Sequence, residues 1–108
     1  MSDGSLIALL QEDPVIVFTC RDGWSLYSSG ILSCSENCVV DHSLLLVGYD
    51  ENSWLLKNSW GEDWGENGYI RISRRYNEDC KIGGRVYVLW SSYLAFFIGW
   101  GLIGILLI

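Results

Sequence analysis

Charge is distributed very unevenly along this chain of 108 residues. All 7 Lys and Arg and all 13 Asp and Glu lie within residues 1–85, whereas the 23 residues of 86–108 carry no charge. As a helix this uncharged stretch would extend about 35 Å, more than the roughly 30 Å of a bilayer's hydrocarbon core. The pattern predicts a small domain over residues 1–85 and one C-terminal transmembrane helix over residues 86–108.

The uncharged stretch has two other interpretations. Residues 86–90 (VYVLW) can instead form the last strand of the domain, which leaves about 18 residues for a span. A signal for a glycolipid anchor is the second alternative, although the polar spacer that such signals contain is absent. Tyr87, Trp90 and Tyr93 favour the membrane interpretation, because aromatic rings gather at bilayer interfaces.

The composition excludes two classes of protein. The formal net charge is −6, so the chain lacks the basic face that a nucleic-acid-binding protein needs. Six Trp, six Tyr and three Phe supply ample surface to bury, which argues against intrinsic disorder.

Local patterns predict one short helix followed by strands. The helix lies before Pro14, with Asp3 or Ser5 as its N-cap. The predicted strands cover residues 15–20, 42–49, 54–60 and 68–75. The run over 42–49 is continuously apolar, which indicates a strand covered on both faces. We therefore expect an α+β fold that is mostly antiparallel β.

The only histidine, His42, lies at the start of one predicted strand, and Asn58 lies near the end of the next. In an antiparallel hairpin these two positions are neighbours. An amide oxygen that accepts from one ring N–H fixes the imidazole tautomer and leaves the other nitrogen free as a base. The alternative is a purely structural histidine and a turn asparagine.

The surrounding sequence closely resembles the second domain of papain-like cysteine peptidases, in the cathepsin L-like branch. The matching segments include Asp41-His42, Val47-Gly48-Tyr49, Lys57-Asn58-Ser59-Trp60-Gly61, Trp64-Gly65-Glu66 and Gly68-Tyr69. Weaker matches extend the resemblance over roughly residues 5–84.

The resemblance implies a role for five residues. His42 corresponds to the general base and acid, Asn58 to the residue that orients it, and Trp60 to the indole that shields their contact. Asp41 and Ser43 flank the histidine, where the family binds its substrate. Peptides or proteins are the implied substrates, and no cofactor or metal is indicated.

The family's nucleophile segment, of the Cys-Gly-Ser-Cys-Trp type, is absent, and Gln11 is the only glutamine. The resemblance therefore predicts the C-terminal half of a membrane-anchored cysteine peptidase, inactive without a Cys-bearing first domain. The alternative is a non-catalytic, membrane-anchored domain that binds peptides or a partner.

Four cysteines in about 85 residues suit an oxidising compartment. In the family pattern Cys80 takes a disulfide partner, which we expect to be Cys38, or Cys34 in its place. Cys20 is then free or paired with the remaining loop cysteine. A zinc site from Cys34, Cys38 and His42 is a weaker alternative.

Met1-Ser2-Asp3-Gly4 lacks the basic residues of a signal peptide. A C-terminal span without a signal would leave the domain in the reducing cytosol, which conflicts with the cysteines. We therefore expect a piece of a longer, single-pass membrane protein whose domain is lumenal, lysosomal or extracellular.

Overall fold

The structure is a computed structural model that describes residues 2–89 and 105–107. Its elements are α1 (Asp3–Leu10), β1 (Val15–Thr19), the 3-10 helix η1 (Trp24–Leu26), β2 (Ile31–Leu32), β3 (His42–Tyr49), β4 (Ser53–Lys57), β5 (Tyr69–Ser73), β6 (Val86–Leu89) and β7 (Ile105–Leu107). One short α-helix beside a mostly antiparallel sheet confirms the predicted α+β class within the described part of the chain.

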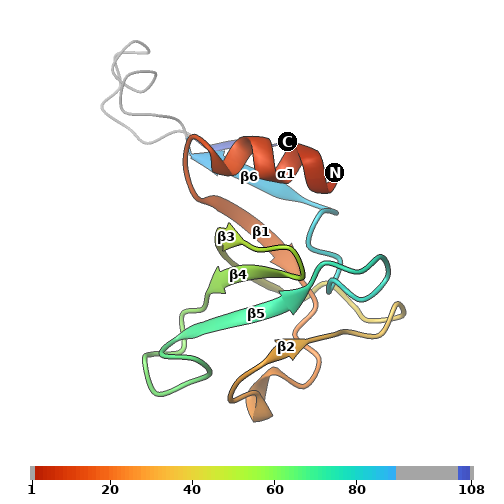
Figure 1. Cartoon of the computed structure of the whole chain (residues 1–108), viewed down its shortest axis with the longest axis vertical. Coiled ribbons are helices and arrows are strands. Elements are labelled where there is room, and N and C mark those ends of the chain that lie inside the picture. Colours follow the sequence, from red (N-terminus) through yellow and green to blue (C-terminus); the bar gives the residue numbers. More distant parts are fainter. Residues whose placement is uncertain (1, 90–104, 108) are drawn as a thin grey trace.

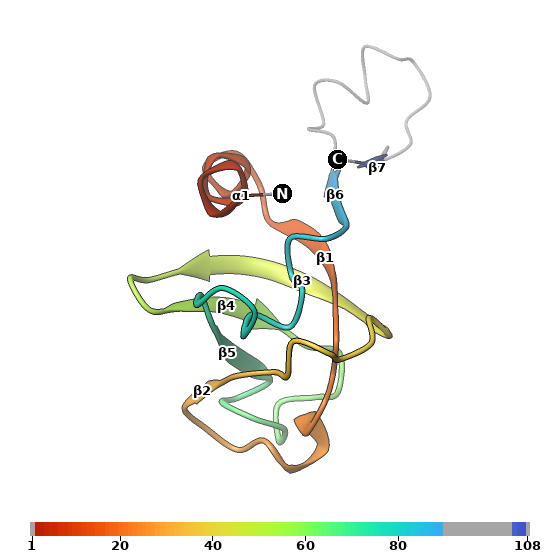
Figure 2. The same ribbon diagram turned by 90° about the vertical axis from the view of Figure 1, so that its right-hand side faces the viewer.

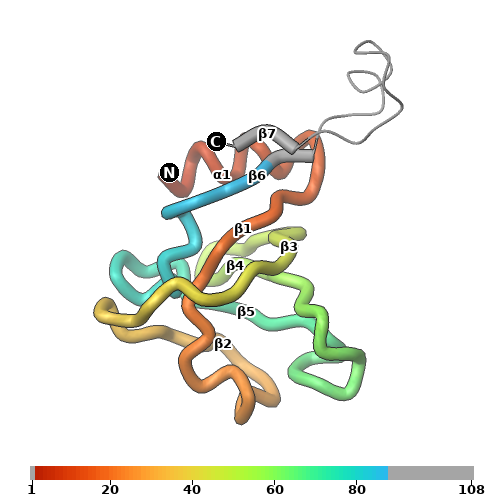
Figure 3. Tube along the Cα trace, turned by 180° about the vertical axis from the view of Figure 1, so that it is seen from behind, coloured from red at the N-terminus to blue at the C-terminus, as the bar shows by residue number. Residues whose placement is uncertain are grey.

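The described strands form one sheet in the order β2-β5-β4-β3-β1-β6-β7. Figure 1 shows β2 at one end of this sheet and β6, beside α1, towards the other; the view from behind in Figure 3 shows the same arrangement. All pairings are antiparallel except that of β2 with β5. Residues 42–57 thus form the predicted hairpin at the centre of the sheet.

One face of the sheet is buried and forms the core. Because strand side chains alternate between faces, the register places the apolar residues of neighbouring strands side by side. Val17 lies opposite Leu44, and Leu46 lies opposite Leu56. The fully or almost fully buried strand residues on this face include Val15, Val17, Leu44, Leu46, Trp54, Leu56, Ile70, Ile72 and Val86.

The N-cap of helix α1 lies before both predicted caps. Ser2 is the N-cap, and its hydroxyl oxygen accepts a hydrogen bond from the Ser5 backbone N–H at 3.2 Å. The prediction of Asp3 or Ser5 was wrong because the chain turns helical immediately after the first serine. Figure 2 shows α1 beside the sheet, and Leu6 on this helix is fully buried.

The second face of β3 differs from the prediction. Leu44 and Leu46 are buried, whereas Leu45 and Val47 are only half-buried. The expectation of a strand covered on both faces was therefore wrong for the chain by itself. An apolar stripe remains partly open to solvent on this side of the hairpin.

The transmembrane helix predicted over residues 86–108 is wrong where the structure describes this stretch. Val86–Leu89 form β6 and pair with β1, as in the alternative interpretation, and Ile105–Leu107 form β7. Strand formation prevails here because β6 satisfies the backbone groups along an otherwise open edge of β1. The described residues include no helix with the length and hydrophobicity to cross a bilayer. Residues 90–104, with Trp90 and Tyr93, lie outside the described residues.

Two disulfide bonds link the loops at one end of the sheet. Cys34 pairs with Cys80 and Cys20 pairs with Cys38. The first expected pairing, Cys38 with Cys80, is therefore wrong, and its stated alternative with Cys34 is found. The Cys20 backbone N–H also donates to the Cys80 carbonyl oxygen at 2.9 Å, so the two bridges lie side by side.

Removing either disulfide should destabilise the domain through the unfolded chain. The bridges close separations of 46 and 18 residues, which the chain-entropy relation converts to about 4 and about 3 kcal/mol. Urea unfolding of Cys34→Ala/Cys80→Ala and Cys20→Ala/Cys38→Ala should show both losses, with the larger for the first pair. Unchanged unfolding free energies in both variants would contradict this expectation.

Candidate active site

The β3–β4 hairpin brings His42 and Asn58 into direct contact. His42 is the first residue of β3 and Asn58 directly follows β4. The imidazole Nε2 and the Asn58 Oδ1 are 2.9 Å apart. Asn58 is only 5% exposed, and its backbone N–H donates to the Gly68 carbonyl oxygen at 3.0 Å, just before β5. The predicted contact between His42 and Asn58 is confirmed. Asn58 is fixed both by its position after β4 and by its backbone hydrogen bond to the residue before β5.

The hydrogen bonds around Asn58 define the imidazole tautomer. The Ser59 backbone N–H donates to the same Oδ1 at 2.9 Å, so the amide oxygen, and not the amide nitrogen, faces this side. An amide oxygen can only accept, so Nε2 must carry the proton and donate it. Nδ1 then has a free lone pair, which gives it the properties of a general base.

Aromatic rings surround the imidazole. The Trp60 ring lies 5.3 Å from the His42 ring between centroids and is 39% exposed, so it forms the outer wall. The fully buried Trp24 meets the His42 ring edge-on at 5.5 Å and forms the inner wall. Trp64 packs on both indoles, and its Nε1–H donates to the Trp24 carbonyl oxygen at 2.8 Å.

Trp24 is the site residue that the sequence analysis missed. It lies in a segment rich in turn residues, within η1, and nothing in its local sequence links it to a histidine 18 positions later. The one available signal was a large apolar ring in an otherwise polar loop. Such a ring is buried when the loop folds back on the sheet.

Asp41 and Ser43 flank His42 but point to different surroundings. The Asp41 carboxylate accepts a hydrogen bond from the Arg21 backbone N–H at 3.2 Å and forms an ion pair with its guanidinium at 3.5 Å. Ser43 is exposed on the opposite face of β3, where it lines a shallow cavity with Lys57 and Ser59. Their role in substrate binding stays a prediction.

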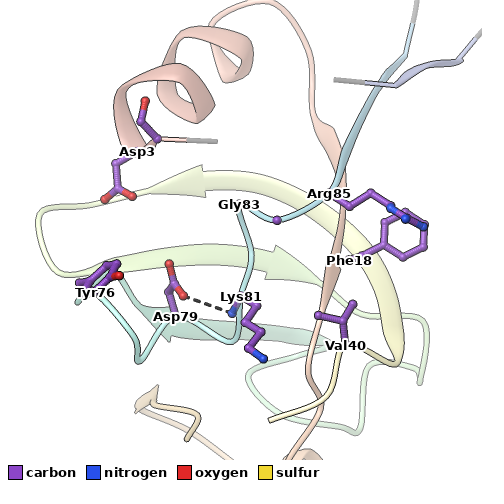
Figure 4. Close-up of a pocket in the computed structure, with 10 residues that line it drawn as sticks. Asp3, Phe18, Val40, Tyr76, Asp79, Lys81, Gly83 and Arg85 are labelled. Atoms are coloured by element: carbon purple, nitrogen blue, oxygen red, sulfur yellow. Dashed lines mark hydrogen bonds between the residues drawn. The ribbon is translucent and has the colours of Figure 1, made fainter. Parts of the chain in front are cut away.

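A larger cavity of about 810 Å³ is lined by residues of β1, of the start of α1 and of segment 76–85, and its lining includes Phe18, Val40, Asp79, Lys81 and Arg85. Figure 4 shows Phe18, Val40 and Arg85 together on one side of it. The Arg85 guanidinium lies over the Phe18 ring, 5.9 Å from its centroid, and Lys81 Nζ donates to the Cys38 carbonyl oxygen. Burial raises the pKa of the Asp79 carboxyl. The described residues that line this cavity do not include His42, Asn58 or Trp60.

The loop that carries Trp60 and Trp64 is held by a charged pair. Arg71 donates two hydrogen bonds of 2.8 Å to the Glu66 carboxylate, which holds the pKa of that carboxyl far below its usual range, at about 2. The neighbouring Gly65 has a positive φ of 60°, and a Cβ there would lie 2.7 Å from the Tyr69 carbonyl oxygen. Only glycine fits this turn.

The model of the family "Papain family cysteine protease" matches residues 3–90 of the chain, a range that includes both His42 and Asn58. The chain belongs to the papain family of cysteine proteases. Its described part has the fold of that family, with the mostly β sheet and one short helix described above.

Individual relatives agree with this assignment. The chain is 51% identical over 73 residues to the viral cathepsin of Adoxophyes honmai nucleopolyhedrovirus, covering 64% of this chain and 22% of that protein. It is 39% identical over 84 residues to cathepsin L of Sarcophaga peregrina, covering 70% and 24%. A cysteine protease of Carica candamarcensis, solved in complex with E-64, superposes with a TM-score of 0.67 at 34% identity, covering 75% of this chain and 40% of that one. The chain therefore spans well under half the length of these relatives.

The cysteines of this papain-family chain cannot act as nucleophile or metal ligands. All four are paired in disulfides, so their sulfurs are neither thiolates nor free thiols. The zinc alternative is wrong for this reason, since it needs the thiolates of Cys34 and Cys38. What the site does offer is an oriented imidazole with a free Nδ1.

The Glu66–Arg71 pair should make stability depend on pH in acid. Because the pKa of Glu66 falls from its usual 4.5 to about 2 on folding, the pair stabilises the domain fully above about pH 4.5. That stability is lost as the pH falls towards 2. Glu66→Gln should remove this part of the acid dependence, measured as unfolding free energy between pH 5 and pH 2. A variant whose acid dependence matches that of the unmodified chain would show that the pair contributes nothing.

Proposed function

We propose that this chain is the histidine- and asparagine-bearing C-terminal half of a papain-like cysteine peptidase. The observation that carries the proposal is the 2.9 Å contact between His42 Nε2 and Asn58 Oδ1, which leaves Nδ1 free. His42 is the general base and acid, Asn58 its positioning residue, and the nucleophilic thiol comes from a Cys-bearing first domain. The substrates are peptides or proteins.

The geometry supports a complete proton cycle at His42. Nδ1 takes the proton of the incoming thiol, and the thiolate attacks the peptide carbonyl carbon. The imidazolium then donates this proton to the leaving amine, and Nδ1 later activates the water that hydrolyses the thioester. Throughout these steps the Nε2–H remains bonded to Asn58 Oδ1, so the ring keeps its orientation. Trp60 excludes water from that bond.

The half-buried face of the hairpin supports the docking of the Cys-bearing first domain on this chain. Ile16 lies opposite Leu45, and Leu45 lies opposite Lys57, so one stripe crosses three strands. Leu45, Val47 and Leu55 are only half-buried there. A domain that brings a thiol to His42 would cover apolar area next to Ser43 and Asn58.

A second candidate is a non-catalytic domain that keeps the family fold and binds a peptide or partner. The disulfide pairing of all four cysteines favours it, because this chain then supplies no nucleophile. The two candidates differ in whether His42 matters for hydrolysis.

Reconstitution separates the candidates. We expect the chain, mixed with the Cys-bearing first domain of a related cathepsin, to hydrolyse a fluorogenic peptide in a reaction that E-64 blocks. His42→Ala should lower the rate about 100-fold or more, the loss of a general base. Asn58→Ala should cause a smaller loss. The control is Tyr76→Ala, at a side chain that is 89% exposed.

The outcomes of this experiment are distinct. Hydrolysis that survives His42→Ala would overturn the proposed role of the histidine. If the two domains associate without activity, and His42→Ala leaves the association unchanged, the binding domain is the correct assignment.

We further propose that the chain is attached to a membrane and faces an oxidising compartment, lumenal, lysosomal or extracellular. The uncharged and largely apolar residues 90–104 support the attachment, and the two disulfides support the oxidising compartment. After alkaline carbonate extraction the full chain should stay in the membrane pellet, whereas a chain ending at Leu89, which keeps β6, should be released. Release of both forms would contradict membrane attachment.

A further inference from the structure

Three buried polar atoms next to His42 have no hydrogen-bond partner among the described residues. They are the Thr19 hydroxyl oxygen Oγ1, the Trp24 indole Nε1 and the Asn58 amide Nδ2. Thr19 and Trp24 are 0% exposed and Asn58 is 5% exposed. Buried polar groups of folded proteins nearly always have a partner, either a protein group or an ordered water.

Each of the three residues borders the imidazole. Asn58 contacts it through Oδ1 at 2.9 Å, and the Trp24 ring meets it edge-on at 5.5 Å. Thr19 is the direct cross-strand partner of His42, so the two side chains lie on the same face of the sheet. The three unpartnered atoms thus belong to side chains that surround one ring.

The chemistry of these atoms excludes direct pairing between two of them. An indole N–H and an amide NH₂ are donors only, so Trp24 Nε1 and Asn58 Nδ2 cannot satisfy each other. Turning the Asn58 amide over would not help, because the Ser59 N–H and the His42 Nε2–H both need its oxygen. Each donor needs an acceptor, and the Thr19 Oγ1 forms no hydrogen bond with either of them.

We propose that one buried water molecule is that acceptor. Its oxygen accepts from Trp24 Nε1–H and from Asn58 Nδ2–H, and one of its hydrogens is donated to Thr19 Oγ1. Three hydrogen bonds to buried polar groups are the usual number for an internal water. Thr19 and Trp24 are then positioning residues, which act on the imidazole through the water and Asn58.

The water has a functional consequence for His42. Held at Nδ2, the Asn58 amide cannot rotate, and its oxygen stays aimed at Nε2. This keeps the proton on Nε2 and the lone pair on Nδ1. Without the water the amide rotates more freely, and the tautomer with the proton on Nδ1 gains population.

This inference deepens the proposed function, because it concerns the same histidine, but its readout is the imidazole itself. His42 is the only histidine of the chain, so its two ring nitrogens give the only histidine signals in a ¹⁵N–¹H spectrum of the full chain. Their chemical shifts report the ratio of the two neutral tautomers. This ratio can be measured even if the chain hydrolyses no peptide.

Thr19→Val and Trp24→Phe each remove one polar group and keep most of the side chain's shape. We expect each to lower the ratio of the Nε2–H to the Nδ1–H tautomer by about threefold to tenfold, the effect of losing one ordinary hydrogen bond. Thr19→Ser keeps the hydroxyl and should preserve the ratio.

Trp54→Phe is the matched control. Trp54 is 0% exposed and its Nε1 also has no partner among the described residues, but it packs against Tyr49 and Arg74 instead of His42. It should resemble Trp24→Phe in lost stability and leave the tautomer ratio unchanged.

Two results would overturn the proposal. An effect of Thr19→Val without any effect of Trp24→Phe would indicate a direct bond from Asn58 to Thr19, with no shared water. An equal change in Trp54→Phe would show that the ratio follows global stability. A Thr19→Val chain that fails to fold leaves the comparison of Trp24→Phe with Trp54→Phe as the test.

Discussion

The antiparallel pairing of β3 with its two neighbours is the constraint on which the rest of the structure depends. Its register places His42 opposite Thr19 on β1 and at the open end of the hairpin, where Asn58 follows β4. A shift by one residue would turn Leu44 and Leu46 out of the core and point His42 away from Asn58. The apolar core and the His–Asn contact therefore favour the same register, so the stability of the sheet fixes the geometry of the site.

The cross-links reinforce this corner of the sheet. Cys20 follows β1 directly and Cys38 lies four residues before β3, so their bridge closes the chain next to His42. The second bridge starts inside the segment that the first one closes and ends at Cys80. A domain of this size has a small core, and such interlocked loops restrict its unfolded state as well as its loop motions.

Much of the fold and the central contact could be predicted, because they depend on local patterns. The alternation and length of the apolar runs gave the hairpin, and the hairpin gave the His42–Asn58 contact. Trp24 could not be predicted, because its position next to the imidazole depends on how a turn-rich loop folds back. The disulfide partner of Cys80 could not be decided for a similar reason. Cys34 and Cys38 lie in one short loop, and only the three-dimensional path of that loop determines which of them reaches Cys80. The helix predicted after Arg85 was wrong for Val86–Leu89 and Ile105–Leu107, because hydrophobicity alone does not separate a lipid-facing helix from a strand that completes a sheet.

The position of β6 affects how the domain can form as the chain is synthesised. β1 is made well before its neighbour on one side, which is built from Val86–Leu89 about 70 residues later. Until then one edge of β1 is open, with its backbone groups unpaired and Val15 and Val17 incompletely covered. The nascent chain can assemble β3, β4 and β5 early through short-range contacts, but the sheet closes over β1 only when the uncharged segment has emerged. Completion of the sheet around β1 thus waits for a segment that lies about 70 residues further along the chain.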